Sequence, residues 1–298
     1  MADALWSNVE LLLSFDGADA SATITDLSSA ARTVTALGNA QLDTARKKYG
    51  TAALLLDGAG DAARLESLTD LILSGDFTIE FWAYFENATP ADYEYLIAAQ
   101  TDTDPFGIVR DTSGYVHLNM DYSFAISSSA AVTSGAWHHI ALERVGSTVT
   151  LYIGGVSQGT YTSAVSYDIA ELYIGASDYA GTGLNLDGSL DDLRFTVGAY
   201  RYGTGFTPPT SALPTDVTAT PVTSLIELPA MLGSAAVLSS LVAGQVVESG
   251  PLGAPSVLGL HDFSAIIGAL ITTYVADLVT PGGTVRAPIS SWQATIRA

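Results

Sequence analysis

Short runs in which apolar and polar residues alternate dominate the sequence, and residues 137–155 (WHHIALERVGSTVTLYIGG) show this pattern most clearly. Alternation with a period of two is typical of a strand that buries one of its faces. The break at Val145-Gly146-Ser147 predicts a hairpin, and Gly154-Gly155 predicts the next tight turn because glycine accepts positive φ. This stretch therefore predicts two antiparallel strands and a turn after each of them.

Two adjacent histidines in this stretch, His138 and His139, raise the question of a metal site or an acid/base pair. Consecutive side chains on a strand point to opposite faces, so the two rings cannot chelate one ion. The remaining histidines, His117 and His261, belong to other segments. We therefore expect His138 and His139 to be satisfied by hydrogen bonds inside or at the rim of a sandwich.

Other segments share the strand composition, with aromatic and β-branched residues between turn-forming Gly, Ser, Asn and Asp clusters. These segments are residues 77–85, 114–120, 170–176 and 188–197. Many short strands at regular spacing are typical of a sandwich or a barrel. Only residues 26–48 are ambiguous enough to hold a helix, so the sequence predicts an all-β fold.

Composition limits the classes of protein to which the chain could belong. Of its 298 residues 48% are hydrophobic, enough for a sizeable core, and the formal charge of -20 disfavours nucleic acid as a partner. Cysteine is absent, which excludes disulfides, thiol catalysis and Cys-ligated zinc. The first residues do not resemble a secretory signal. Residues 228–247 carry no charge, but their Gly, Ala and Ser content favours packed strands and turns over membrane insertion.

A linker divides the sequence. Residues 203–221 contain four prolines among threonines and serines, a composition typical of an extended segment. We expect a first domain over 1–210, and a linker with a smaller β-rich attachment module over 211–298. Within the module, PAMLGSAAVLSS and GPLGAPSVLGL share a pattern that suggests paired strands of similar packing, and residues 288–298 (PISSWQATIRA) read as a further strand.

Several motifs in order resemble one family, the laminin-G-like, concanavalin A-like jelly-roll domains. They are LLLSFDG (11–17), KKYGTAALLLDGAGDAARL (47–65), DFTIEFWAYF (76–85), GAWHHIALERVGSTVTLYIGG (135–155) and LDGSLDDLRFTVGAYRY (186–202). The resemblance covers about residues 5–210 and implies an antiparallel jelly-roll sandwich. One departure is Gly154, where many relatives have Asp.

Because concanavalin A-like folds include glucanases, catalysis has to be tested. Retaining glycosidases need two carboxylates about 5 Å apart. Glu80 and Glu86 share a strand face, but six residues of strand separate them by roughly 20 Å. The Glu-x-Asp-x-Glu cluster of such glucanases and a GxSxG motif are both missing. We therefore expect no enzymatic activity, with a polysaccharide-degrading glycoside hydrolase as the alternative.

Aspartates precede glycine at several positions, and the resemblance implies a structural Ca²⁺ that bridges early and late strands. Such an ion would recruit Asp16 together with Asp187 or Asp191, because calcium prefers carboxylate oxygens on flexible loops. The alternative is that these Asp-Gly pairs simply build turns. No other cofactor is expected.

The resemblance also implies sugar recognition, in which aromatic rings stack on sugar rings and polar side chains fix the hydroxyls. Ordinary packing at the rim is the alternative for each ring. The candidate binding residues are tyrosines expected on loops: Tyr93, Tyr95, Tyr122, Tyr167, Tyr179, Tyr200 and Tyr202.

Residues 270–298 resemble a segment of tail-associated virion proteins of bacteriophages. This resemblance implies a non-enzymatic structural protein of the phage tail or capsid surface, made in the host cytoplasm. Its jelly roll would adhere to host-surface glycans or brace the particle, and its partners would be other virion proteins, copies of itself as a homo-oligomer, and a cell-surface glycan. A bacterial surface adhesin unrelated to phage is the other alternative.

Overall fold

The chain was analysed as a computed structural model, which describes residues 3–101, 106–120, 123–177 and 184–214, and three strands of the later sequence. The chain divides into two compact units, Met1–Thr218 and Ala219–Ala298. The sequence-based boundary at residue 210 falls slightly earlier than this division. Each unit is described by itself below.

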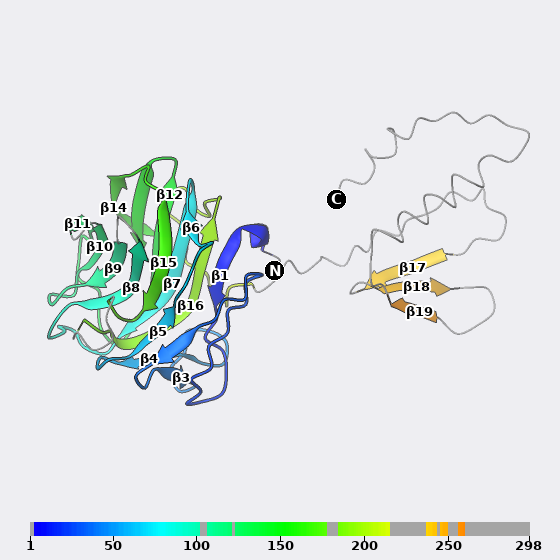
Figure 1. Cartoon of the computed structure of the whole chain (residues 1–298), viewed down its shortest axis with the longest axis horizontal. Coiled ribbons are helices and arrows are strands. Elements are labelled where there is room, and N and C mark those ends of the chain that lie inside the picture. Colours follow the sequence, from blue (N-terminus) through cyan, green and yellow to red (C-terminus); the bar gives the residue numbers. More distant parts are fainter. Residues whose placement is uncertain are drawn as a thin grey trace, which may run out of the picture. The chain divides into compact units, whose positions relative to one another are not determined.

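The first unit is an antiparallel sandwich of two sheets (Figure 1). Sheet 1 has the order β14 (Val156–Thr162), β13 (Thr148–Ile153), β12 (Trp137–Val145), β7 (Phe77–Phe85), β16 (Asp187–Val197), β4 (Ala53–Asp57) and β3 (Gln41–Asp43), and β1 (Val9–Leu13) also pairs with β16. A short 3-10 helix, η1 (Trp6–Asn8), precedes β1.

Sheet 2 packs against sheet 1 through the core. It has the order β11 (Ser123–Ser127), β10 (Val116–Met120), β9 (Phe106–Arg110), β8 (Glu94–Thr101), β15 (Tyr167–Ile174), β5 (Ala62–Leu65) and β2 (Thr35–Leu37), and β6 (Ile72–Leu73) also pairs with β15.

Alternation along the strands builds the core between the sheets. Phe77, Ile79 and Phe81 of β7 point inward and belong to a single buried cluster with residues such as Ile108 and Leu118 of sheet 2. Burying an aromatic or aliphatic side chain of this size stabilises a fold by about 1.5–3 kcal/mol. The sandwich is therefore held by packing, as expected for a chain without cysteine.

The outer faces of the two sheets differ. On sheet 1, residues 198–214 cross the outward side, and we call this segment the strap. The backbone N–H of Arg201 donates to Thr78 Oγ1 (3.1 Å), and the Tyr49 hydroxyl donates to the carbonyl of Pro209 (2.8 Å). The strap explains why outward residues of β7 such as Glu80 are as buried as the inward ones.

The all-β prediction is confirmed, and β7 and β12 have the predicted bounds. Gly146-Ser147 joins β12 to β13, and Gly154-Gly155, with φ of 59° and 77°, joins β13 to β14. The possible helix over 26–48 is wrong, because this range contains β2, β3 and turns. Its few apolar residues pack onto the sheets instead of forming one continuous helical stripe.

In the second unit, β17 (Val237–Val242), β18 (Gln245–Ser249) and β19 (Ser256–Gly259) form a three-stranded antiparallel sheet. The two copies of the sequence pattern contain β17 and β19, which pair with the intervening β18 and not with each other. Within the described part of the chain, no helix is long and apolar enough to cross a membrane. The strand expected over 288–298 lies outside the described residues.

Candidate functional site

The outer face of sheet 2 carries an exposed aromatic ring, Phe124, that the sequence pattern would bury. Phe124 and Ile126 are two residues apart on β11, so regular alternation places both on the same face. A bulge at Ala125 breaks this alternation, because Leu118 pairs with Ile126 whereas the next residue, Asn119, pairs with Phe124. Ile126 consequently packs in the core while Phe124 lies outside and is 45% exposed. Bulges often re-aim a side chain next to a functional site.

His117 lies beneath Phe124 and holds its ring in place. The two rings stack in parallel, with centroids 4.0 Å apart and planes at 8°. His117 Nδ1 is hydrogen-bonded to Ser127 Oγ (2.8 Å), and Nε2 lies 3.1 Å from Asp111 Oδ2 at an angle unsuited to a hydrogen bond. The imidazole is therefore fixed on both sides, and Phe124 rests on a rigid support.

Two tyrosines extend this surface across the neighbouring strands. Tyr93, just before β8, is 40% exposed and meets Phe124 edge-on with centroids 6.0 Å apart. A second bulge, between Tyr95 and Ile97 of β8, turns Tyr95 outward, where its ring covers Gly107. Asn119 Nδ2 donates to the Tyr95 hydroxyl (3.1 Å). We call Tyr93, Tyr95, His117, Asn119 and Phe124 the aromatic face.

A buried ion pair supports the loop that carries Tyr93. Arg110 Nη1 donates to Glu94 Oε2 (2.7 Å), and Nη2 donates to the backbone carbonyls of Asn87 (2.7 Å) and Ala88 (2.8 Å). Burial raises the pKa of Glu94, and Arg110 offsets part of that effect. Arg110 and Glu94 are both buried, so the ion pair fixes the Arg110 guanidinium. The guanidinium in turn holds the backbone carbonyls of the loop.

The arrangement of the aromatic face suits a ligand with flat apolar surfaces and many hydroxyls. Exposed rings offer π-faces for C–H groups, and a few fixed polar groups provide orientation. The exposed carboxylate of Asp92, next to Tyr93, can accept a hydroxyl proton from such a ligand. A sugar meets all of these requirements.

The structure separates the candidate tyrosines. Tyr93 and Tyr95 belong to the aromatic face, whereas Tyr200, which is 45% exposed, lies within the strap on the sheet 1 side. Tyr167 is wrong as a surface ring, because it is 3% exposed within the core. Tyr202 is wrong for a similar reason, since it stacks on Phe206 (3.5 Å) and donates to Glu80. Tyr122 and Tyr179 lie outside the described residues.

The sequence reasoning missed Phe124 and His117, the best-supported pair of the face. Searching only for tyrosines on loops excluded a phenylalanine on a strand and a histidine. The available signal was the short hairpin of residues 116–127, in which His117 and Asn119 alternate with buried residues. No sequence motif predicts the bulge at Ala125.

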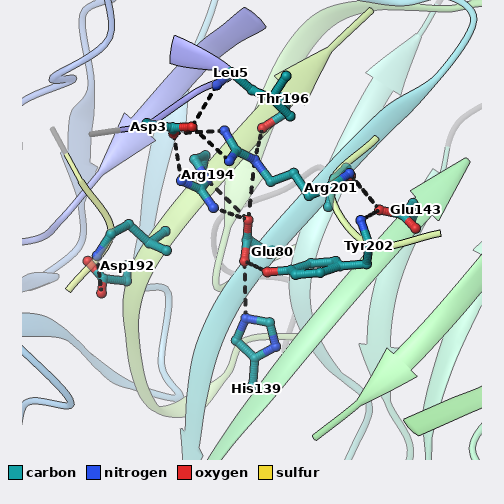
Figure 2. A network of polar contacts seen from close by, with 12 residues as sticks. Asp3, Leu5, Glu80, His139, Glu143, Asp192, Arg194, Thr196, Arg201 and Tyr202 are labelled. Carbon is teal, nitrogen blue, oxygen red and sulfur yellow. Dashed lines mark hydrogen bonds and ion pairs between the residues drawn. The ribbon is translucent and has the colours of Figure 1, made fainter. Parts of the chain in front are cut away.

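A second polar cluster lies under the strap on sheet 1, and it contains His139 (Figure 2). Glu80 is its centre: Arg194 Nε donates to Glu80 Oε1 (3.0 Å), and His139 Nε2 lies 3.3 Å from Glu80 Oε2. Burial alone would raise the pKa of Glu80, but Arg194, His139 and Tyr202 together lower it to about 2. Glu80 is thus a fixed anion.

The strap closes this cluster from above. Arg201 donates from Nη1 and Nη2 to the two carboxylate oxygens of Asp3 (3.0 and 2.9 Å), and Glu143 accepts the backbone N–H groups of residues 201–203, two of which are drawn in Figure 2. With Glu80 and Glu143 both at most 1% exposed, a substrate has no access to these carboxylates. The arrangement is that of a buried structural network.

The predicted orientation of the two histidines to opposite faces is confirmed, although the buried Nδ1 of His139 has no hydrogen-bond partner among the described residues. His139 contacts Glu80 under the strap, whereas His138 points the other way and its Nε2 lies 2.8 Å from the carbonyl oxygen of Thr133. Burial lowers the pKa of His138. The two rings therefore belong to different environments and share no ligand.

The proposed calcium ligands fall into two separate places. Asp187 pairs with Asp57 across the ladder and accepts from Asn87 (2.6 Å). Asp191 Oδ2 accepts the N–H groups of Lys48 (2.7 Å) and Tyr49 (3.0 Å), and burial raises its pKa to about 7, with a further contribution from Asp16. Within the described residues no three acidic or histidine side chains are arranged to hold a metal ion. The three candidates therefore do not form one ligand cluster among the described residues, and a structural calcium ion held by Asp16 with Asp187 or Asp191 stays a prediction.

Residues 57–199 match the family model described as the concanavalin A-like lectin/glucanases superfamily, of laminin-G type. The two antiparallel sheets agree with this match, which supports a concanavalin A-like lectin/glucanase fold for the first unit. No curated protein sequence matches this chain.

Two solved structures illustrate the fold. Domain 4 of an extracellular arabinanase from Geobacillus stearothermophilus, solved with arabinotriose, is 21% identical with a TM-score of 0.50, and the match covers 65% of this chain and 94% of that one. The binding domain of Paraclostridial mosquitocidal protein 1 is 17% identical with a TM-score of 0.51, over 71% of this chain and 51% of that one. Our chain thus spans about half the length of the second relative.

Proposed function

We propose that this chain is a non-enzymatic protein that binds a glycan on the aromatic face of sheet 2. The observation that carries the proposal is the bulge at Ala125, which exposes Phe124 on the rigid support of His117 beside Tyr93. The exposed rings of Phe124 and Tyr93 contact each other, and neighbouring exposed apolar groups mark a binding site more readily than a single exposed ring does. The arabinanase domain solved with arabinotriose supports a sugar as the ligand class.

The proposal that the chain is not an enzyme rests on its carboxylates. Glu80 is sealed under the strap and paired with Arg194, and Glu86, after the end of β7, pairs with Arg46. A retaining or inverting glycosidase needs two carboxylates on either side of an accessible bond. Neither residue meets this requirement, so binding is favoured over the glycoside hydrolase alternative.

The wider role we propose is that of a bacteriophage virion protein, with the second unit attaching the domain to a tail or capsid. The support is the resemblance of residues 270–298 to tail-associated proteins and a charge of -20, which disfavours nucleic acid as the ligand. A particle would carry many copies of the chain, bound to each other and to other virion proteins. Several weak sugar contacts made at once would then give firm adhesion to the host. Alternatively, the copies would brace the particle.

The binding proposal is tested by applying the full chain to a glycan array and then assaying the bound glycans for release of reducing sugar. We expect binding without turnover. Phe124→Ala should abolish the binding, and Tyr200→Ala, which removes an equally exposed ring on the other side of the sandwich, should retain it. Turnover of a bound glycan would establish the enzyme instead.

The virion proposal needs a different measurement. Proteins of purified phage particles from the source of this sequence should include the chain, and an electron-microscopy map should place it on the tail or capsid surface. Recovery of the chain from bacterial cell surfaces in the absence of particles would favour the adhesin alternative.

A further inference from the structure

The strands that form the aromatic face are almost devoid of positive charge. Arg110 is the only lysine or arginine between Arg64 and Arg144. Its side chain is fully buried, and it is neutralised by Glu94. It therefore cannot contact a ligand on the surface.

The nearest other cations in the sequence are also engaged. Arg64 lies on β5, separated from β8 by β15, and pairs with Glu66 and Glu171. Arg144 belongs to sheet 1 and donates to the carbonyls of Leu73, Gly75 and Val165. Neither offers a free charge to the outer face of sheet 2.

Carboxylates, in contrast, lie at the aromatic face. Asp92 is exposed, and its Oδ1 accepts the backbone N–H of Tyr93 (2.7 Å). Asp111 lies beside His117, and although burial acts in the opposite direction, the N–H of Tyr115 and the imidazole lower the pKa of Asp111. The Asp111 carboxylate thus lies against the only histidine of the aromatic face.

From this charge distribution we infer that the glycan bound by the aromatic face is uncharged, and that sugars carrying carboxylates are rejected. The inference rests on the proposed function and names the ligand class of the same site. A uronic or sialic acid would lose its hydration and find carboxylates but no cation. A neutral sugar loses nothing comparable, because its hydroxyls can donate to the exposed Asp92 while its C–H faces stack on the rings.

The test compares neutral oligosaccharides with counterparts oxidised at C6: galacto- with galacturono-, cello- with cellourono-, and manno- with mannurono-oligosaccharides. Affinities of the full chain are measured by calorimetry at about 20 mM and about 500 mM NaCl. EDTA is present so that a divalent cation cannot bridge two carboxylates. At least one neutral oligosaccharide should bind, and Phe124→Ala should abolish its binding. Its acidic counterpart should bind at least about tenfold more weakly at low salt, and this difference in affinity should become smaller at high salt.

Two charge variants locate the effect. Asp92→Lys should reduce the difference in affinity between the neutral and the acidic oligosaccharide of a pair at low salt. Asp168→Lys makes the same change in net charge at the opposite end of the β8–β15 ladder. It should leave the difference in affinity between the neutral and acidic oligosaccharides nearly unchanged. Equal effects of the two variants would contradict the inference, because net charge and not the face would then control selectivity.

The remaining outcomes separate the two proposals. Phe124-dependent binding of an acidic sugar as tight as that of its neutral counterpart would overturn the inference and leave the proposed function intact. No Phe124-dependent binding to any pair, together with no such binding on the glycan array, would overturn the proposed function and the inference with it.

Discussion

Phe124 reaches solvent because the chain accommodates one extra residue, Ala125, opposite Asn119. An exposed ring contributes little to folding, whereas a buried ring of the same kind contributes a great deal. Phe106, on β9 of the same sheet, provides the comparison because it is 4% exposed and packs in the core. The same substitution at the two positions therefore separates binding from stability.

We expect Phe124→Ala to change the free energy of unfolding by less than about 1 kcal/mol and Phe106→Ala to lower it by about 3–5 kcal/mol. Urea unfolding of both variants measures the difference. A loss of several kcal/mol at Phe124 would assign the ring a structural role and weaken the binding proposal.

Two buried aspartates make stability depend on pH at the residue scale. Burial raises the pKa of Asp191 to about 7, and burial together with the charge of Asp191 raises that of Asp192 to about 7. The folded state then keeps protons that the unfolded chain releases from about pH 4 upward, so these groups make stability fall as pH rises from about 4 to 7. Glu80 acts in the opposite sense below about pH 4.5, since folding lowers its pKa to about 2.

Between about pH 5 and about pH 8 we expect the free energy of unfolding to fall, and Asp192→Asn to reduce that fall by about 1 kcal/mol or more. Asparagine suits the position, because it tolerates the backbone φ of 47° and keeps an acceptor for the N–H of Leu213. Denaturation curves at both pH values provide the comparison. An unchanged pH dependence in the variant would exclude Asp192 as its source.

At the scale of elements, the turn between β13 and β14 couples the hairpin to the strap. Gly154 and Gly155 both have positive φ, but only Gly155 is crowded: a Cβ there would lie 1.8 Å from the carbonyl oxygen of Phe206. Nothing lies within 4 Å of the corresponding position at Gly154.

We expect Gly155→Ala to destabilise the domain by about 2 kcal/mol or more, because strain at positive φ adds to displacement of the strap. Gly154→Asn should change stability by less than about 0.5 kcal/mol, since asparagine tolerates this conformation. Thermal unfolding of the two variants tests the pair. Similar losses at both positions would mean that φ alone, and not the strap, sets the cost.

The elements divide into those that sequence reasoning could predict and those that it could not. β7 and β12 were predictable because their alternation is unbroken and their inward residues are large and apolar. The sequence predicts a linker over much of the strap, because prolines at 208, 209 and 214 indicate an extended chain. A segment that lies on a sheet is also extended, so the prolines do not distinguish it from a free linker. The aromatic face was only partly predictable, since Tyr93 stands in an evident loop whereas two bulges decide the faces of Tyr95 and Phe124.

On the scale of the whole molecule, the first unit has its own core and should fold without the second. The strap must be included, because Leu213 packs with Val9 and Leu12, and its N–H donates to Asp192. A chain of residues 1–218 should unfold in one cooperative transition. A chain that ends at residue 200 should be strongly destabilised, since Arg201 and Tyr202 no longer surround Glu80. Equal stability of the two truncated chains, measured by calorimetry, would contradict the role assigned to the strap.

The central claim is that the aromatic face of sheet 2 binds a glycan, and a crystal structure of the chain with the best neutral oligosaccharide from the array tests it most directly. We expect a sugar ring stacked on Phe124 beside Tyr93, with a hydroxyl within hydrogen-bond distance of Asn119 or Asp92. An oligosaccharide bound elsewhere, such as beside Tyr200 on the sheet 1 side, with the aromatic face empty, would contradict the claim.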